Sequence, residues 1–256
     1  MKERNIMIIR KNDLVLTTPP YSRKTLEGFT LAEVLITLVI IGVIAAITVP
    51  TLIIKHQKEE TVTRLKKVYS TLSQTTYKAV AEYGDIKTWE MMDGVTGEAS
   101  QYFTKKYMLP YLSIAKDCGL QTTNECKFEY NNLNGSTGRN IDNSYHRFYL
   151  SDGTLVAVNA RQNLSSSGHK KMANIFVDIN GQKKPNKQGR DIFGFNYMID
   201  CIFPQLNGKL VPRYFDQNRA SLVSNSDSMC HKNQQGDGCL ALIMLDSWQI
   251  KDDYPW

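Results

Sequence analysis

The stretch GFTLAEV, residues 28–34, decides the fold of this 256-residue chain. Its glycine closes a polar, basic leader, and an apolar run opens at Phe29 and continues to Ile54 with Glu33 as its single ionisable side chain. A bilayer core requires about 20 apolar residues as a helix, so this run is long enough to span a membrane. Because a lone charge in hydrocarbon costs at least ~2.5 kcal/mol, we expect Glu33 to have a partner and a function.

The leader differs from a secretory signal peptide. A signal peptide is cut after an apolar core of ~7–15 residues, whereas the candidate glycine here precedes the apolar run, so the hydrophobic helix stays on the mature protein. The leader holds six basic and three acidic side chains, a net charge of +3. Since positive charge stays cytoplasmic, the C-terminal part is expected outside the cytoplasm. A plain single-pass anchor, with Glu33 incidental, is the alternative.

Apolar residues continue beyond the run at three- and four-residue spacing, which predicts an amphipathic helix that prolongs the first one. They are Val62, Leu65, Tyr69, Leu72, Thr76, Ala79 and Tyr83. The helix is expected to run from about Phe29 to Tyr83 and to end at Gly84. Pro50, which lacks a backbone donor, is expected to bend or locally melt it. We interpret the apolar stripe as the face that packs on the chain's own head domain; a coiled-coil seam is the alternative.

The remaining residues predict one head domain with an antiparallel sheet. Asp152-Gly153 between the apolar runs 146–150 and 155–158 is a strong hairpin signal. Further strands are expected at 175–179 and 192–199, and a helical piece at 99–109. Residues 240–245 fit a short helix or a strand, and we favour the helix. A long N-terminal helix packed on an antiparallel sheet is an α+β fold.

GFTLAEV followed by a membrane-length apolar helix resembles the N-terminal signature of type IV pilins and of the pseudopilins of type II secretion. The resemblance implies cleavage between Gly28 and Phe29 by prepilin peptidase, a membrane aspartic enzyme, and N-methylation of Phe29. It also implies that Glu33 meets the terminal ammonium of a neighbouring subunit and thereby sets the register of assembly. Gly42 and Pro50 match positions at which the helix in this family is often weakened or kinked.

Four segments follow from the apolar pattern and the resemblance together. They are a cleaved leader (1–28), a transmembrane half-helix (29–54), an amphipathic half-helix (55–84) and a globular head (85–256). The resemblance implies a structural subunit of a pilus-like filament or a secretion pseudopilus, with other pilin or pseudopilin subunits and an inner-membrane assembly platform as partners. The protein is expected in the cytoplasmic membrane with its head outside, and then in a filament in the periplasm or at the cell surface. A minor tip subunit that binds exported protein, DNA or a surface is the alternative.

Five cysteines all lie in the part expected outside the cytoplasm, where an oxidising compartment permits disulfides. The short loops Cys118 to Cys126 and Cys230 to Cys239 are the natural pairs, and the odd count leaves Cys201 over. The second loop resembles the disulfide-closed C-terminal loop of many pilins. Metal binding by the cysteines is the alternative.

The segment 178–191 is richer in turn formers than a hairpin needs. Asp178, Asn180 and Asp191 supply oxygen atoms of the kind that calcium prefers, and the major pseudopilins of type II secretion resemble this chain in carrying a calcium-stabilised loop beside the sheet. The alternative, which we favour, is a tight loop whose side chains bond nearby backbone donors. No cofactor is required by the sequence.

Catalytic motifs are missing from the sequence, since no metalloprotease, phosphate-binding or serine-hydrolase pattern occurs. The four histidines are scattered, and we predict that the protein is not an enzyme. Basic clusters at 105–106 and 169–171 are the kind that bind nucleic acid. The mature chain, however, holds 25 basic and 22 acidic residues, a net charge of +3, which gives no strong nucleic-acid signal.

Overall fold

The computed structural model describes residues 28–164, 169–201, 204–216 and 218–256. The chain forms two compact units, residues 1–50 and 51–256, and helix α1 (Leu31–Tyr83) contributes to both. Except for Gly28, the predicted leader lies outside the described residues. The first unit is therefore described only by its part of α1 and the residues just before it.

Helix α1 ends where the sequence predicts. Gly84 follows Tyr83 with a φ of 76°, and its N–H donates to the carbonyl of Val80 at 2.9 Å. This left-handed conformation suits glycine, which has no Cβ to clash, and it closes the last turn of the helix. The start of α1 at Leu31 lies two residues after the expected one.

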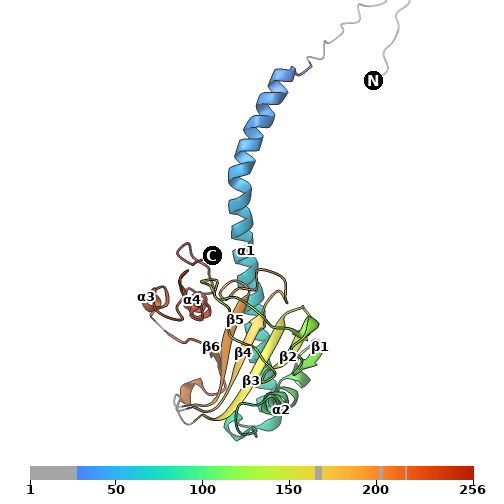
Figure 1. The fold of residues 1–256 in the computed structure, drawn as a ribbon, viewed down its shortest axis with the longest axis vertical. Coiled ribbons are helices and arrows are strands. Elements are labelled where there is room, and N and C mark those ends of the chain that lie inside the picture. Colours follow the sequence, from blue (N-terminus) through green and yellow to red (C-terminus); the bar gives the residue numbers. More distant parts are fainter. Residues whose placement is uncertain (1–27, 165–168, 202–203, 217) are drawn as a thin grey trace, which may run out of the picture. The chain divides into compact units, whose positions relative to one another are not determined.

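A six-stranded antiparallel sheet forms the centre of the second unit, with its strands in chain order (Figure 1). The strands are β1 (Ile114–Gly119), β2 (His146–Leu150), β3 (Leu155–Leu164), β4 (His169–Asp178), β5 (Ile192–Asp200) and β6 (Leu210–Pro212). Asp152 accepts the N–H of Thr154 at 3.1 Å in the predicted hairpin turn between β2 and β3. The predicted α+β class is confirmed, while β1 and β6 were missed and β4 begins earlier than expected.

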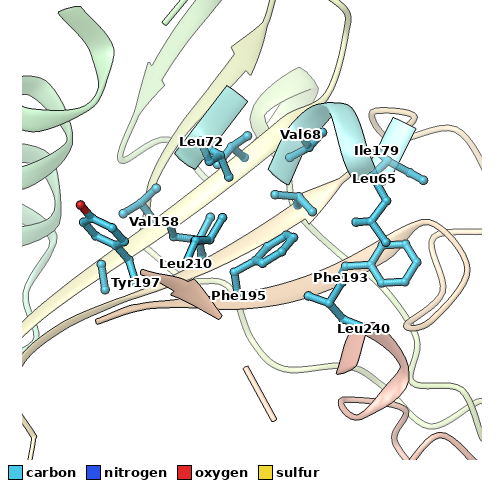
Figure 2. Packing of buried hydrophobic residues seen from close by; sticks show 14 of the residues in the cluster. Leu65, Val68, Leu72, Val158, Ile179, Phe193, Phe195, Tyr197, Leu210 and Leu240 are labelled. Carbon is cyan, nitrogen blue, oxygen red and sulfur yellow. The ribbon is translucent and has the colours of Figure 1, made fainter. Parts of the chain in front are cut away.

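One face of the sheet packs on the second half of α1. Because strand side chains alternate between faces, β3 sends Val156 and Val158 to the helix side and Leu155 and Ala157 to the other. Figure 2 shows Leu65, Val68 and Leu72 of α1 lying against residues of β3, β5 and β6. The predicted apolar stripe of α1 is therefore a packing face for the head.

The opposite face is covered by the segment between β1 and β2, which contributes the aromatic residues Phe128, Tyr130 and Tyr145. This segment is held by Arg147 of β2, which is fully buried. Its guanidinium donates to the backbone carbonyls of Gln121, Ile141, Asp142 and Tyr145. Buried charge is tolerated only when it is hydrogen-bonded, and these carbonyls provide the bonds.

Short helices complete the second unit. They are α2 (Gly97–Tyr107), α3 (Arg219–Leu222) and α4 (Cys239–Leu245), with 3-10 turns at Ile86–Thr88, Leu109–Tyr111, Asn124–Cys126 and Pro204–Leu206. The helix predicted at 99–109 is confirmed as α2, although it begins and ends two residues earlier. The helical interpretation of 240–245 is confirmed as α4.

Candidate functional site

The start of α1 is closed by reciprocal hydrogen bonds between Thr30 and Glu33. The backbone N–H and the hydroxyl of Thr30 each donate to Oε2 of Glu33 at 2.8 Å, and the N–H of Glu33 donates to Oγ1 of Thr30 at 3.2 Å. This arrangement is a capping box, in which Thr at the N-cap and Glu three residues later satisfy each other's backbone donors. It explains why the helix begins at Leu31. The Thr-x-x-Glu pattern is visible in the sequence, but the sequence interpretation considered only the charge of Glu33.

The predicted cleavage site lies just before this cap. The side chain of Phe29 is 88% exposed, and no heavy atom lies within 4 Å of the position that a Cβ on Gly28 would take. Among the described residues nothing shields the peptide bond between them. Cleavage at this bond remains a prediction, and the geometry is compatible with it.

The apolar side chains that follow the cap are exposed. The exposed large apolar residues from Leu31 to Ile54 have 43–80% of their surface accessible. Helix α1 is long and apolar enough to cross a membrane. Burying such surface from water yields roughly 25 cal/mol per Å². This helix together with the sequence motif fits a membrane-anchored protein.

Gly42 and Pro50, the predicted positions of helix weakening, both lie inside α1, which runs through them without interruption. No heavy atom outside the helix backbone lies within 4 Å of a Cβ built on Gly42. A bend at Pro50 stays a prediction.

Two buried carboxylates meet in the loop between β4 and β5. Asp178 is 2% exposed and Asp191 is 3% exposed. Burial, followed by the negative charge of Asp191, raises the pKa of Asp178 to about 7. Burial likewise raises the pKa of Asp191. The structure thus brings together all three predicted metal-site residues, since Asn180 donates hydrogen bonds to both carboxylates.

Backbone donors already occupy the carboxylate oxygens. Asp178 accepts from the N–H groups of Asn180 and Gln182 at 3.2 and 2.9 Å. Asp191 accepts from the N–H groups of Asn186 and Lys187 at 2.8 and 2.6 Å, and the amide of Asn180 donates to it at 3.3 Å. These are the bonds expected of the tight loop that the sequence interpretation favoured.

The same loop holds two further oxygen atoms with no hydrogen-bond partner among the described residues, Oδ1 of Asn180 and Oδ1 of Asn186, and both are buried. Two carboxylates and two amide oxygens suit a hard divalent cation in kind, but calcium takes roughly six to eight oxygens. Within the described residues no group of three or more His, Cys, Asp or Glu side chains is placed to hold a metal ion. Backbone carbonyls or water must therefore supply the remaining ligands of any cation.

The cysteines form two short-range disulfides. Cys118 and Cys126 are joined at an S–S distance of 2.08 Å, and Cys230 and Cys239 at 2.05 Å. Cys201 is buried and belongs to neither bond. The first disulfide fastens the segment that covers the sheet to β1, and the second ties the start of α4 to the loop before it.

His146 is fully buried and has a carboxylate beside it. Its Nε2 is 2.8 Å from Oδ1 of Asp117, and its burial lowers the imidazole pKa even though Asp117 acts in the opposite direction. The pair has a ready structural interpretation, since it joins β2 to β1.

One lysine in each basic cluster considered for nucleic acid has partners inside the protein. Lys106 forms an ion pair with Glu90 at 2.8 Å. The ammonium of Lys171 donates to the carbonyls of Lys87 and Trp89 at 3.2 and 2.7 Å. These two lysines are therefore engaged in holding the fold.

Comparison with known proteins gives two matches. Residues 51–256 match the family described as "Family of unknown function (DUF6613)", and residues 24–49 match the "Prokaryotic N-terminal methylation motif". The second match includes the whole of GFTLAEV and confirms the resemblance to type IV pilins and pseudopilins. No curated protein and no solved structure matches the chain.

Proposed function

This chain belongs to the family of unknown function (DUF6613) and carries a prepilin-type methylation motif, and from these facts we propose that it is a structural subunit of a type IV pilus-like filament or a type II secretion pseudopilus. The motif indicates a pilin-type subunit in general, with a structural and non-enzymatic role. The observation that carries the proposal is the combination of that motif with a helix whose first half exposes its apolar side chains.

In the proposed sequence of events, the chain inserts with its head outside the cytoplasm and prepilin peptidase cuts after Gly28. The apolar half of α1 then leaves the bilayer for a bundle of identical helices on the assembly platform. Cleavage gives Phe29 a free ammonium group, and the carboxylate of Glu33 from another subunit neutralises it. Neither charge is stable alone in hydrocarbon, so their pairing sets the register of the subunits.

The capping box offers a competing explanation for Glu33, and three variants separate the two. Glu33→Gln keeps a side chain that can accept the Thr30 donors but removes the charge. Thr30→Ala removes the hydroxyl bonds of the cap and keeps the charge, and Glu33→Val removes the charge together with the bonds that the carboxylate accepts. If the charge drives assembly, both Glu33 variants are processed at Phe29 yet yield few filaments, whereas Thr30→Ala assembles.

Mass spectrometry of the N-terminus, on sheared surface material and on membranes separately, measures processing and assembly in one experiment. A methylated Phe29 terminus in the sheared fraction supports the proposal. Normal filament yield from Glu33→Gln with poor yield from Thr30→Ala would instead assign Glu33 to the cap. An intact leader found in membranes alone would reduce the protein to an ordinary anchored one.

A minor tip subunit is the second candidate role, and the specific observation in its favour is a pocket in the loops of the head whose lining includes Lys187, Arg190, His231 and Lys232. Abundance separates the two roles. Quantitative mass spectrometry of sheared filaments should find a major subunit along the whole filament, whereas a tip subunit should occur at a few copies per filament.

Calcium binding by Asp178, Asn180 and Asp191 is proposed as a stabilising feature of this subunit rather than as a requirement. Its support is the pair of carboxylates with raised pKa and the two amide oxygens without partners. Added calcium should raise the melting temperature of the full chain in detergent, and Asp178→Asn should abolish that increase. An unchanged melting temperature after treatment with chelator would rule out calcium and leave the tight loop.

A further inference from the structure

A basic pocket of about 530 Å³ lies where three loops of the head meet. We call it the cationic pocket, because its lining includes Lys187, Arg190, His231 and Lys232. The first two come from the loop between β4 and β5, and the other two from the loop closed by the disulfide Cys230–Cys239. Trp256 forms part of its wall.

The backbone that carries these side chains is fixed by hydrogen bonds between the loops. The segment around Asn131 is joined to the β4–β5 loop, since Asn131 N–H donates to the Asn186 carbonyl at 2.9 Å and Gln188 N–H donates to the Asn131 carbonyl at 2.8 Å. The same segment is joined to the disulfide loop by bonds from Leu133 and Asn134 to the carbonyls of Gln235 and Gln234, both at 2.9 Å. The pocket is thus built before any ligand arrives.

The lysines and the arginine of the cationic pocket have no ion-pair partner among the described residues. The one carboxylate side chain in its lining, that of Asp253, is bound by both terminal nitrogens of Arg219, at 2.8 and 2.9 Å. In the part of the chain that the structure describes, neither Lys187, Arg190 nor Lys232 forms an ion pair. This contrasts with Lys67, Lys106 and Lys116, each of which lies within 2.9 Å of a carboxylate.

Among the basic residues of the cationic pocket, Arg190 gives the strongest indication that the pocket binds a ligand. Its guanidinium carbon lies 5.5 Å from the ring centre of Trp256, a cation–π contact that restrains the side chain. Its Nε is buried, and no acceptor for it occurs among the described residues. A buried donor without an acceptor costs about 1–3 kcal/mol. The site therefore holds a preoriented, incompletely satisfied donor beside two further positive charges.

We propose that the cationic pocket binds a phosphate-type oxyanion, with Arg190 as the main donor and Lys187 and Lys232 as flanking charges. Guanidinium groups present several N–H donors in a plane that matches the oxygens of such anions, and charge-assisted bonds of this kind are the stronger class. The anion belongs either to a small soluble phosphate compound or to the headgroup of an anionic lipid. The pocket shares no residue with the cap formed by Thr30 and Glu33, so the inference is independent of the role proposed for Glu33.

The test uses the full chain in micelles of a zwitterionic detergent, by isothermal titration at constant ionic strength. Inorganic phosphate is titrated in one arm and a short-chain phosphatidylglycerol in the other, with sodium chloride as the reference. We expect saturable binding at one site per chain in at least one arm. Tighter binding in the first arm identifies a soluble phosphate, and tighter binding in the second identifies a lipid headgroup.

Variants locate the binding in the pocket. Lys232 is exposed, so Lys232→Gln should fold normally, and we expect it and Arg190→Gln each to weaken binding ~tenfold, as the loss of one charge-assisted hydrogen bond predicts. Lys78→Gln, an exposed lysine of α1, makes the same change in net charge and should leave binding unaltered. Heats that match those of chloride in both arms, or equal weakening by Lys78→Gln, would overturn the proposal.

Discussion

The two halves of helix α1 treat their apolar side chains in opposite ways. Between Leu31 and Ile54 the exposed large apolar residues have 43–80% of their surface open. In the second half, five apolar residues on the face toward the sheet are at most 9% exposed, namely Val62, Leu65, Val68, Leu72 and Ala79. Helix α1 therefore exposes its apolar side chains in its first half and buries them in its second half.

This difference shows where each half finds its partner. The second half is buried within the chain, because the sheet supplies the surface that covers it. The first half has no cover among the described residues, so a bilayer or other helices must provide it. The comparison can be tested by changing matched residues in the two halves, and the size of the effect should follow the burial.

Leu65→Ala should give the largest effect. Leu65 is fully buried, and truncating a buried leucine costs about 2–5 kcal/mol from lost burial and the cavity left behind. Urea unfolding of the full chain in detergent, followed by tryptophan fluorescence, measures the loss. The matched control is Leu38→Ala in the exposed half, for which we expect a change within about 0.5 kcal/mol. An equal loss from both variants would mean that the two halves are not energetically separate.

The division of α1 could be anticipated from the sequence because each half has its own pattern. The unbroken apolar run predicts a membrane segment, and the three- and four-residue spacing from Val62 to Tyr83 predicts a packing face. The β2–β3 hairpin was equally clear, since Asp152-Gly153 favours one kind of turn. Strand β6 was missed because Leu210–Pro212 is only three residues long and is defined as a strand by its pairing with β5.

Other features could not be predicted from local patterns in the sequence. Strand β1 carries Lys116 and Asp117 in its middle and shows little alternation, so its place is set by pairing with β2. The burial of Arg147 depends on four carbonyls brought together by the fold. The cationic pocket joins residues more than 40 positions apart, such as Arg190 and Lys232. The capping box at Thr30 was different, since its signal is local and was present in the sequence.

The second prediction concerns the loop on which the buried half of α1 docks. Arg64 donates to the carbonyl of Ile179 at 3.3 Å, next to Asp178, whose pKa is raised to about 7 by burial and by Asp191. Between about pH 4 and pH 7 the folded protein thus binds more protons than the unfolded chain, so the free energy of unfolding should fall as pH rises. One such proton accounts for at most about 1.4 kcal/mol per pH unit.

Asp178→Asn should flatten this dependence, because the side chain no longer has to ionise. Urea titrations at several pH values in chelator give the slope, and the slope rather than the absolute stability is diagnostic, since asparagine cannot accept both backbone N–H groups. Asp252→Asn removes an exposed carboxylate and should keep the original slope. Identical slopes for Asp178→Asn and the unaltered protein would show that this carboxylate does not titrate in that window.

We expect the smallest effect on the free energy of unfolding from an exposed ion pair of the second half of α1. Lys67 forms an ion pair with Asp152 at 2.9 Å and so joins α1 to the turn between β2 and β3. Its side chain is 63% exposed, and exposed ion pairs contribute only about 0–1 kcal/mol. Lys67→Gln should therefore lower the free energy of unfolding slightly, and less in high salt than in low salt. The neighbouring Lys66→Gln makes the same change in net charge without breaking an ion pair, so only the difference between the two variants measures the pair. A difference above about 2 kcal/mol would exceed what an exposed pair supplies, and it would mean that α1 depends on this turn as much as on its apolar face.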